Sequence, residues 1–586
     1  MAKGLSGEDR IIRVALCQRN LFVGDIPGNV AKIRQSLAGV KDAGADLVLF
    51  PELTITGYPP EDLLLKPYFA EKAAAALYEL ANEVEDVVAV VGFPQLLDDL
   101  FNTAAVIAGG EVAAVYRKRY LPNYGPFDEQ RYFARGDDAL VLDMDGVKVG
   151  VTICEDLWYP GGPAEWAVLD GDADVLVNLS ASPYHRGKGP EREEMLATRC
   201  EDYSCYLAFC NMVGGQDELL FDGHSVVIDP RGVVLGRCRQ FEEDTLVMDL
   251  DLRGVSRRRL HDPRWRQRHG SKRDQVRVVP VRRARRKKPK FEMSPPVQVV
   301  RDEAEVYAAL VLGTADYFRK NAFDHAVLGV SGGIDSALAL AVAVDALGSE
   351  AVTAVSMPSR YTAQHNREDA AECARRVGVD FKELPIDGVF GCYLDALEEP
   401  FAGTDPNVAE ENIQARIRGN VLMALSNKFG WLVLATGNKS EYSVGYATLY
   451  GDMAGGFAIL KDVSKTWVYR LARWRNRTEE VVPPRVLEKP PTAELRAGQL
   501  DSDTLPPYEV LDPILEAYVE EDRSPEEIEK MGFDRELVYR VAEMVDRAEY
   551  KRRQAPPGIR ISPRAFGRDR RLPITNGYRS GVGSGD

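Results

Sequence analysis

The chain has 586 residues, of which 45% are hydrophobic and 28% charged, and it carries a formal net charge of −16. Because single hydrophobic cores stop growing near about 250–300 residues, this length predicts more than one domain. The acidic balance argues against general nucleic-acid binding. No apolar run reaches the roughly 18 residues of a membrane span, and the start MAKGLSGEDRIIRV lacks the apolar centre of a secretion signal. Eight cysteines without a C-x-x-C pair predict no disulfide framework, so we expect a cytoplasmic protein without a membrane partner.

From residue 11 to about 250, short β-rich runs alternate with helical patterns, such as the helical period over 29–44. This alternation predicts a layered α/β domain. The expected strands are IIRVALCQ (11–18), DLVLF (46–50), VVAVVGF (87–93), TAAVIA (103–108), VKVGVTI (147–153), DVLVNL (174–179) and CYLAFCNMV (205–213).

Three reactive residues come directly after expected strands: Glu52, Lys118 and Cys154. Strand ends are where open α/β folds gather reactive groups. A cysteine at a strand-to-helix turn can have its thiolate stabilised by the helix N-terminus and a nearby ammonium. A carboxylate can move the thiol proton, and a lysine can stabilise an oxyanion. A lone cysteine after a strand is more often a buried apolar residue, which is how we interpret the other seven cysteines. Ser-His hydrolase chemistry is disfavoured, because the chain has no G-x-S-x-G and only six histidines.

The sequence segments around these residues resemble those of the nitrilase superfamily: FPELTITGYPPEDLL (50–64), YRKRYLPNYGPFDEQRYF (116–133) and TICEDLW (152–158). The resemblance implies an αββα sandwich over 10–252 and a Glu52–Lys118–Cys154 triad acting on an amide. Glu129 would be a second supporting glutamate. The residues that it suggests as glutamine contacts are Tyr124, Ser182, Lys188 and Glu155.

Between 253 and 299 the periodicity fails and basic residues gather, most densely in VRRARRKKPK (281–290). One interpretation is a nucleic-acid or membrane patch. The favoured one, given the acidic chain, is a solvated inter-domain linker that packs on an acidic neighbour.

A second α/β block begins at residue 300, with an expected helix over 302–320 and strands over 326–330, 351–357 and 431–436. Another helix is expected over 364–377. The first strand leads into SGGIDS (331–336), where a Gly-Gly turn and a helix start would place free N–H groups at a positive helix end. No lysine follows the glycines, so the loop is not the P-loop of kinases or GTPases. The plain alternative is a helix N-cap in a tight turn.

SGG-x-DS resembles the pyrophosphate loop of the N-type ATP pyrophosphatases. That loop alone leaves GMP, asparagine and argininosuccinate synthetases and tRNA-modifying thiolases open. Four further sequence segments resemble the NAD synthetase family: ENIQARIRG (411–419), the run 434–469 beginning LATGNKSEYS, PPTAEL (490–495) and YKRRQAPPG (550–558). With the nitrilase-like block in front, the resemblance is to the glutamine-dependent form. It implies a doubly wound parallel-sheet, Rossmann-like domain over 300–578, and we expect the tail 579–586 to be disordered.

The expected contacts of the second block fall into three groups. The ATP contacts are Gly329, Val330, Ser331, Gly332, Gly333, Ile334, Asp335, Ser336 and Thr436. The contacts expected for deamido-NAD⁺ are Asn412, Arg416, Glu441, Asp452, Lys461 and Lys551. The carboxylates expected to hold Mg²⁺ are Asp335 and Glu441.

The two blocks together predict that ammonia from glutamine converts an adenylated deamido-NAD⁺ to NAD⁺. Free ammonia is mostly protonated near pH 7, so a glutaminase in the same chain would supply the neutral amine, and the resemblance implies a tunnel between the sites. The alternatives are another amidotransferase, an ammonia-only synthetase with a structural amidase block, and a basic scaffold centred on 281–290. The expected partners are glutamine, ATP and deamido-NAD⁺, with no nucleic acid. The family resemblance implies a homo-oligomer, at least a dimer and up to an octamer.

Overall fold

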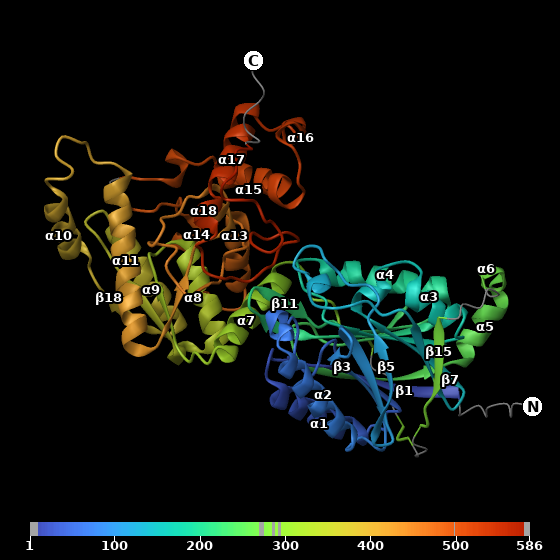
Figure 1. Cartoon of the computed structure of the whole chain (residues 1–586). Helices are drawn as coiled ribbons and strands as arrows, with labels where there is room; N and C mark the ends of the chain where they lie inside the picture. The colour runs from blue at the N-terminus through green and yellow to red at the C-terminus, as the bar shows by residue number, and fades with distance from the viewer. Residues whose placement is uncertain (1–9, 269–274, 284–287, 291–294, 497, 579–586) are drawn as a thin grey trace, which may run out of the picture. The chain divides into compact units, whose positions relative to one another are not determined.

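The structure, a computed structural model, describes residues 10–268, 275–283, 288–290, 295–496 and 498–578. The chain divides into two compact units (Figure 1). The first contains residues up to 216 and 220–300, and the second contains 217–219 and the chain from 301 onward. Among the described residues, no helix is both long enough and apolar enough to cross a bilayer.

The first unit contains two β-sheets. One has the order β14-β1-β2-β3-β4-β5 and the other β13-β12-β9-β8-β7-β6-β15. The strands of the first sheet are β1 (Ile11–Gln18), β2 (Leu47–Leu49), β3 (Val88–Leu96), β4 (Leu100–Ala108), β5 (Glu111–Arg117) and β14 (Asp244–Asp251). Those of the second are β6 (Ala139–Met144), β7 (Val147–Ile153), β8 (Val175–Ser180), β9 (Tyr206–Asn211), β12 (Val226–Ile228), β13 (Val234–Arg237) and β15 (Val276–Pro280). A separate hairpin consists of β10 (Val213–Gln216) and β11 (Leu219–Asp222).

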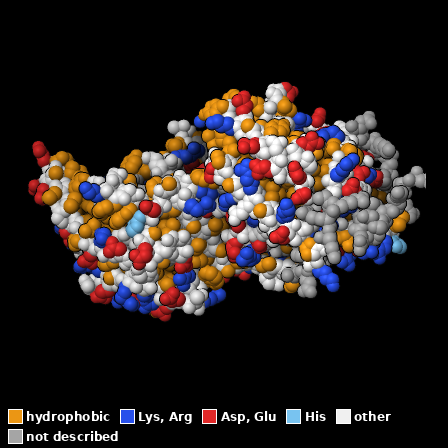
Figure 2. All heavy atoms as spheres, turned by 90° about the horizontal axis from the view of Figure 1, so that it is seen from below, with side chains coloured by type: hydrophobic (Ala, Val, Ile, Leu, Met, Phe, Trp, Pro, Cys, Tyr) orange, Lys and Arg blue, Asp and Glu red, His pale blue; other side chains and the backbone are white. Residues whose placement is uncertain are grey.

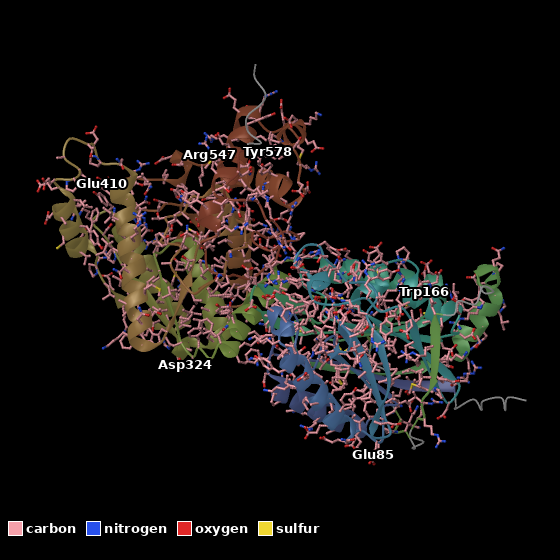
Figure 3. All side chains as sticks on the ribbon, viewed as in Figure 1. Glu85, Trp166, Asp324, Glu410, Arg547 and Tyr578 are labelled. Atoms are coloured by element: carbon pink, nitrogen blue, oxygen red, sulfur yellow. The ribbon has the colours of Figure 1, made fainter. Side chains whose placement is uncertain are left out.

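Helices cover the outer faces of these sheets. The first sheet carries α1 (Ile26–Lys41) and α2 (Pro67–Ala81), and the second carries α3 (Gly162–Leu169) and α4 (Lys188–Tyr203) (Figure 1). Trp166, labelled in Figure 3, belongs to α3, and the Arg119 guanidinium lies 4.7 Å from the centre of its ring. The order of layers is α, β, β, α, so the sandwich expected for this half is confirmed.

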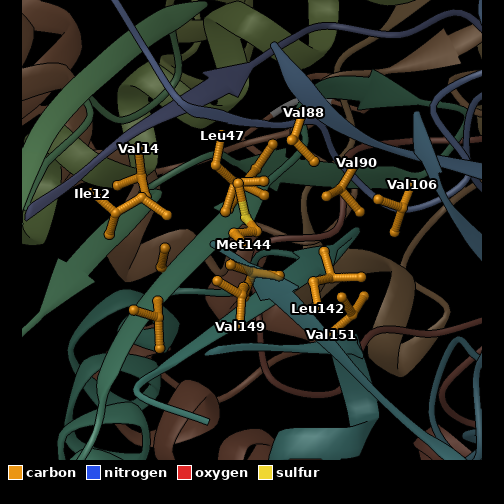
Figure 4. Close-up of a cluster of buried hydrophobic side chains, with 14 of the residues drawn as sticks. Ile12, Val14, Leu47, Val88, Val90, Val106, Leu142, Met144, Val149 and Val151 are labelled. Carbon is orange, nitrogen blue, oxygen red and sulfur yellow. The ribbon is translucent and has the colours of Figure 1, made fainter. Parts of the chain in front are cut away.

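The main core of the unit lies between the two sheets, where strands present buried aliphatic side chains to each other (Figure 4). The first sheet contributes Ile12, Val14, Leu47, Val88, Val90 and Val106, and the second contributes Leu142, Met144, Val149 and Val151. Because alternate residues of a strand point to opposite faces, the residues between them can pack under the outer helices. The strand ends that carry Glu52, Lys118 and Cys154 are therefore anchored in a close-packed interior.

The prediction of a linker over 253–299 is wrong for much of the segment that the structure describes. It contains α5 (Arg253–His261), α6 (Pro263–Arg268) and β15, which pairs in parallel with β6. The partner strand lies far away in sequence, so no local periodicity signals the pairing. In the basic segment 281–290, Lys288 pairs with Asp46, while 284–287 lie outside the described residues. On the face in Figure 2, basic and acidic side chains are interspersed.

The second unit is built on a parallel sheet of order β18-β17-β16-β19-β20. Its strands are β16 (Ala326–Gly329), β17 (Val352–Ser356), β18 (Asp380–Glu383), β19 (Leu432–Ala435) and β20 (Phe457–Ala458). After β18 the chain returns to the other side of β16, so the strand order reverses between β16 and β19. In open α/β sheets, ligands bind at the carboxyl ends of the strands where the order reverses. SGGIDS and Thr436 follow these two strands, and the doubly wound fold is confirmed.

Helices flank this sheet on both faces. One face carries α10 (Asp387–Leu397) and α11 (Val408–Phe429), and the other carries α7 (Asp302–Lys320), α8 (Ile334–Leu347), α9 (Gln364–Val377) and α13 (Lys465–Arg475). The helices expected over 302–320 and 364–377 are confirmed at both ends. The remaining helices are α12 (Lys439–Val444), α14 (Pro484–Glu488), α15 (Tyr508–Leu515), α16 (Pro525–Lys530), α17 (Arg535–Arg547) and α18 (Glu549–Arg552). The helices α15, α16 and α17 share a hydrophobic cluster with residues around them. The tail 579–586 lies outside the described residues.

Candidate active sites

A buried cluster in the first unit joins a lysine to two glutamates. The Nζ of Lys118 lies 2.7 Å from Glu52 Oε1 and 2.8 Å from Glu129 Oε1. The side chains of Lys118 and Glu52 are 0% exposed. The side-chain amide of Asn102 donates to the same Glu52 oxygen at 2.7 Å, and the Ala181 N–H donates to the other at 3.0 Å. Glu52 is thus held by three donors.

Three strand ends bring these groups together. Glu52 follows β2, Lys118 follows β5, and Cys154 begins a short 3₁₀ helix (Cys154–Leu157) directly after β7. Gly92 on β3 gives the Glu52 segment room, because a Cβ at that position would lie 2.3 Å from the Leu53 nitrogen. Cys154 has a φ of +42°, in the left-handed region that a residue with a side chain rarely adopts. Strain of this kind is typical of functional sites.

The thiol of Cys154 is buried, and burial raises its pKa well above the ordinary value. The charge of Glu52 raises the pKa further, and the charge of Lys118 offsets only part of this rise. The sequence suggested a thiolate stabilised by a helix N-terminus and an ammonium, and the structure contradicts this for the free site. Glu155 and Glu129 raise the pKa as well, so Cys154 rests as a neutral thiol that needs a base.

Glu129 shares Lys118 with Glu52. Burial raises the pKa of Glu129 to about 7, with Lys118 opposing the rise and Glu52 adding to it. The phenol of Tyr58 donates to Glu129 Oε1 at 2.8 Å. Burial is therefore the main cause of this raised value, and the nearby charge of Glu52 adds to it.

The expected glutamine contacts lie on two sides of Cys154 in the sequence. The phenol of Tyr124 donates to Glu155 Oε1 at 2.9 Å, and Glu155 adjoins the cysteine. The Lys188 ammonium lies 4.1 Å from the centre of the Trp158 ring and 3.0 Å from Glu191 Oε1. Ser182 is buried, and its N–H donates to Asn211 Oδ1 at 2.9 Å. Tyr124 and Glu155 therefore form one polar pair at the cysteine, and Trp158 links Lys188 to the same turn.

Sequence reasoning missed Asp156, which ties the cysteine turn to the lysine strand. Asp156 accepts hydrogen bonds from the N–H groups of Arg119 (3.2 Å), Tyr120 (3.1 Å) and Ile153 (3.0 Å). It also accepts one from the Tyr116 phenol at 2.7 Å. Asn102 and Tyr58 were missed as well. Their partners come from distant strands, and the only local signal is that Asp156 stands two residues after the cysteine.

In the second unit, the SGGIDS loop is a tight turn between β16 and α8, held by hydrogen bonds within the loop. The Ser331 N–H donates to Ser336 Oγ at 3.3 Å, and the Gly333 N–H donates to Ser331 Oγ at 3.2 Å. Gly332 has a φ of +79°, and a Cβ there would lie 2.3 Å from the Asn366 carbonyl oxygen. Gly329 ends β16, Val330 is buried, Ile334 begins α8, and Thr436 directly follows β19. The loop therefore stands at the helix N-terminus where the strand order reverses.

The two carboxylates expected to hold a metal face one ammonium. Lys465 Nζ lies 2.5 Å from Asp335 Oδ2 and 3.5 Å from Glu441 Oε1. The side-chain amide of Asn438 donates to Asp335 Oδ1 at 2.9 Å. Burial and the charge of Asp335 raise the pKa of Glu441 to about 8. Lys465 and Asn438 were not singled out from the sequence, because their role depends on contacts with Asp335, more than 100 residues away.

Four of the six expected dinucleotide contacts surround the segment 445–452. The Lys551 ammonium donates to the carbonyl oxygens of Gly445 (2.7 Å) and Ala447 (2.8 Å). Arg416 Nε donates to the Leu449 carbonyl at 3.2 Å. Thr448 links the other two: its N–H donates to Asp452 Oδ1 at 2.8 Å and its hydroxyl to Asn412 Oδ1 at 2.7 Å.

Burial raises the pKa of Asp452 to about 6. Lys461 lies outside this group, since its ion pair joins it to Glu218 at 3.0 Å.

The eight cysteines are all free thiols. Seven are buried and Cys392 is exposed, so interpreting Cys392 as a buried residue is wrong, because it lies on a solvent-facing part of α10.

Comparisons with known proteins agree with the division of the chain into two units. The carbon-nitrogen hydrolase family matches residues 13–259, and the NAD synthase family matches 306–555. The chain is 50% identical over 572 residues to a glutamine-dependent NAD(+) synthetase of Thermotoga maritima, covering 97% of this chain and 99% of that protein. Identity to the Aquifex aeolicus glutamine-dependent NAD(+) synthetase is 47% over 572 residues, covering 97% and 100% of the two chains.

Solved structures give the same result. The glutamine-dependent NAD⁺ synthetase of Acinetobacter baumannii, in complex with ADP, matches with a TM-score of 0.71 and 42% identity, over 97% of this chain and 99% of that one. A Cytophaga hutchinsonii glutamine-dependent NAD(+) synthetase matches in fold, with a TM-score of 0.80, 21% identity and coverage of 97% and 98%. The chain belongs to the glutamine-dependent NAD(+) synthetase family, with a carbon-nitrogen hydrolase domain followed by an NAD synthase domain.

Proposed function

We propose that the chain makes NAD⁺ from deamido-NAD⁺, ATP and the amide nitrogen of glutamine. The overall reaction consumes water and yields glutamate, AMP and pyrophosphate, so the enzyme is a ligase with glutamine as its amide donor. The observation that carries the proposal is the buried Glu52–Lys118–Glu129 cluster beside Cys154, in a chain whose SGGIDS loop is also intact. An ammonia-only enzyme would have no need of the first cluster.

In the first site, the Cys154 sulfur attacks the γ-amide carbon of glutamine while Glu52 accepts the thiol proton. Lys118 supports the negative charge on the tetrahedral oxygen. Glu52 then protonates the departing nitrogen, so that ammonia leaves and a γ-glutamyl thioester remains. Water, deprotonated by Glu52, cleaves the thioester to glutamate and restores the thiol. The raised pKa of Cys154 supports a base-assisted attack, because the free thiol holds its proton.

Recognition of glutamine is assigned to polar groups around this site. Tyr124 and Glu155 form a hydrogen-bonded pair next to the cysteine and would hold the amino end of the substrate. Ser182 and Lys188 lie beyond it on the segment after β8 and would complete the contacts. Glu129 supports Lys118 as a second carboxyl group on the same nitrogen.

In the second site, the N–H groups of the SGGIDS loop and the hydroxyls of Ser331 and Ser336 hold the ATP phosphates. Thr436, at the end of the neighbouring strand, contacts the nucleotide. The nicotinate carboxylate of deamido-NAD⁺ attacks the α-phosphorus, which releases pyrophosphate and leaves an adenylated carboxylate. Ammonia attacks that carbonyl carbon and AMP leaves with its bonding electrons, giving the amide of NAD⁺. Asn412, Arg416, Asp452 and Lys551 orient the dinucleotide, and Lys461 stabilises the released pyrophosphate.

The residues present suit a magnesium ion bound with ATP. No cluster of three or more candidate metal-ligating side chains occurs within the described ranges. Mg²⁺ commonly uses one or two carboxylates and completes its shell with water and phosphate oxygens. Asp335 and Glu441, which both face the Lys465 ammonium, would hold it once Glu441 releases the proton that its raised pKa favours in the free site. Bound there, the ion would neutralise phosphate charge, while Lys465 and Asn438 orient the two carboxylates.

Passing ammonia directly to the second site would keep it unprotonated, and we include such transfer in the proposal. The proposal also includes a cytoplasmic homo-oligomer, at least a dimer, without nucleic-acid or membrane partners.

The test is the Cys154→Ala variant assayed with each nitrogen source. Glutamine-dependent NAD⁺ formation should fall by about 10³-fold or more, because the nucleophile is gone. NAD⁺ formation from ammonium chloride should persist within a few-fold, because the second site is untouched. Full glutamine-dependent activity in this variant would refute the assignment of Cys154, and absence of NAD⁺ from both sources in the unmodified chain would refute the function.

A further inference from the structure

A buried ion pair lies next to Ser182, one of the residues proposed to bind glutamine. Arg192 on α4 is 1% exposed and Asp222 at the end of β11 is 0% exposed. One guanidinium nitrogen, Nη2, lies 2.9 and 2.8 Å from the two oxygens of Asp222. Stability alone does not explain such a pair, because an apolar pair of similar volume is often as stable or more so. The pair therefore calls for a second role.

The other nitrogen of the guanidinium reaches Ser182. Arg192 Nη1 lies 3.4 Å from Ser182 Oγ and donates to it. A guanidinium has no acceptor, so the Ser182 hydroxyl must direct its own hydrogen elsewhere. The backbone of Ser182 is fixed as well, because its N–H donates to Asn211 Oδ1 and Asn211 Nδ2 donates to the Gly223 carbonyl at 2.8 Å. Arg192 thus sets the direction in which Ser182 can offer a hydrogen bond.

The segment after β11 also contacts the first turns of α4. His224 is 0% exposed, and its Nε2 lies 2.6 Å from Glu193 Oε1. Gly189 leaves space for that ring, since a Cβ there would lie 2.7 Å from His224 Nδ1. Glu193 also accepts from Arg237 Nη2 at 2.9 Å. The helix begins at Lys188, so these contacts fix the start of the residue run that carries the Lys188 ammonium.

We propose that Arg192, paired with Asp222, is a positioning residue for glutamine binding, acting through the Ser182 hydroxyl and the start of α4. This inference rests on the proposed glutaminase function of the first unit. It assigns Arg192 no contact with the reacting atoms, and it requires the chemistry at Cys154 to survive loss of the guanidinium. Loss of the guanidinium should therefore change the KM for glutamine more than kcat.

The experiment uses the full chain and avoids leaving a buried charge alone. Arg192→Met combined with Asp222→Asn removes both charges with little change in volume, and Arg192→Lys keeps the charge without the two-armed reach. Ser182→Ala is made in each background. We expect the KM for glutamine, and the glutamine concentration that half-protects Cys154 from iodoacetamide, to rise about 10-fold in the charge-free variant, the usual effect of one hydrogen bond to a charged group. Both values for the Arg192→Lys variant should lie between those of the charge-free variant and those of the unmodified chain.

A double-mutant cycle separates positioning from general damage. If Arg192 acts through Ser182, adding Ser182→Ala to the charge-free variant should change little, whereas independent effects would multiply. The control is Arg13→Met with Asp249→Asn, which removes an ion pair of 2.7 Å between β1 and β14, and it should leave glutamine protection within two-fold.

Three results overturn the inference. The first is glutamine protection within two-fold of the unmodified chain, and the second is a set of effects that multiply with those of Ser182→Ala. The third is a change in the rate at which iodoacetamide modifies Cys154 that parallels the change in glutamine protection and is also seen in Arg192→Lys. Such a change would show that Arg192 has a structural role. Protection needs no NAD⁺ formation. A chain that binds glutamine at Cys154 but makes no NAD⁺ would therefore refute the proposed function and leave the assignment of Arg192 standing.

Discussion

The ammonium of Lys118 lies 2.7 Å from Glu52 Oε1, and neither side chain is exposed to solvent. With Glu129 at 2.8 Å on the same nitrogen, one buried cation balances two carboxyl groups. The lysine therefore makes the burial of both glutamates possible, in addition to its proposed role of stabilising an oxyanion. Its pKa is raised well above the usual range, since the nearby carboxylates outweigh the burial that would lower it.

Replacing Lys118 should affect both stability and activity. Lys118→Met leaves two buried carboxylates without their cation, so we expect the first unit to lose about 3–5 kcal/mol of stability. Glutamine hydrolysis should become undetectable, while ammonia-dependent NAD⁺ formation persists. Hydrogen exchange of the β-strands in the first unit measures the loss. Lys72→Met on the exposed side of α2 is the matched control and should change stability by less than about 0.5 kcal/mol.

The raised pKa of Glu129 predicts how stability depends on pH. The folded chain holds this proton up to about pH 7, whereas the ordinary value is 4.5. A group with a higher pKa in the folded state binds more protons there, so stability falls as the pH rises between these values. The Glu129→Gln variant should lose this part of the fall. Hydrogen exchange in the first unit at pH 5 and pH 8 measures it.

Glu83→Gln serves as the control for that experiment. The pKa of Glu83 is lowered by its hydrogen bond with Arg34 on an exposed surface, so its effect runs in the opposite direction and is screened by solvent. An unchanged pH dependence in Glu129→Gln would contradict the assignment of the raised pKa to that residue.

The phosphate loop depends on Gly332 for a steric reason. Gly332→Ala would combine a φ of +79° with a Cβ only 2.3 Å from the Asn366 carbonyl oxygen, so the loop must move. We expect NAD⁺ formation to fall by about 10²-fold or more with either nitrogen source, because the N–H groups lose their alignment on the phosphates. Glutamine hydrolysis measured alone should continue.

Gly348→Ala is the matched control, with a φ of +86° and open space where the Cβ would go. Its positive φ also strains an alanine, by about 1–3 kcal/mol, but without the collision. NAD⁺ formation within two-fold in this variant, together with its loss in Gly332→Ala, would separate the steric effect from lost stability. Equal losses in both variants would contradict the prediction.

Asp335 is expected to be needed for synthesis and not for hydrolysis. Asp335→Asn removes a carboxylate that faces Lys465 and that is proposed to hold Mg²⁺. NAD⁺ formation should fall by about 10²-fold or more with glutamine or with ammonia, and glutamine hydrolysis should survive at least in part. The control, Asp345→Asn near the other end of α8, loses a pair with Arg475 and should retain synthesis. Loss of both activities in Asp335→Asn would argue that it acts on the fold of the whole chain.

Local patterns were sufficient to predict the elements that carry the chemistry. β1, β7, α7 and α9 have the predicted ends, because each is marked by an unbroken period or by clear breaking residues. The strand-end positions of Glu52, Lys118 and Cys154 follow from the same patterns. The segment 253–299 could not be predicted in this way, since β15 forms only by pairing with β6, more than 100 residues earlier.

The sequence by itself determined the two-domain α/β architecture, the SGGIDS loop and the residues able to react, because these depend on period, turn chemistry and side-chain type. The tertiary structure decided which charges meet. It placed Glu129 on Lys118, Lys465 between Asp335 and Glu441, and Arg192 against Ser182, none of which follows from spacing along the chain. It also reversed the expected state of Cys154. Burial and the charges of Glu52, Glu155 and Glu129 outweigh one ammonium there, and the balance of these effects depends on distances that only the folded chain has.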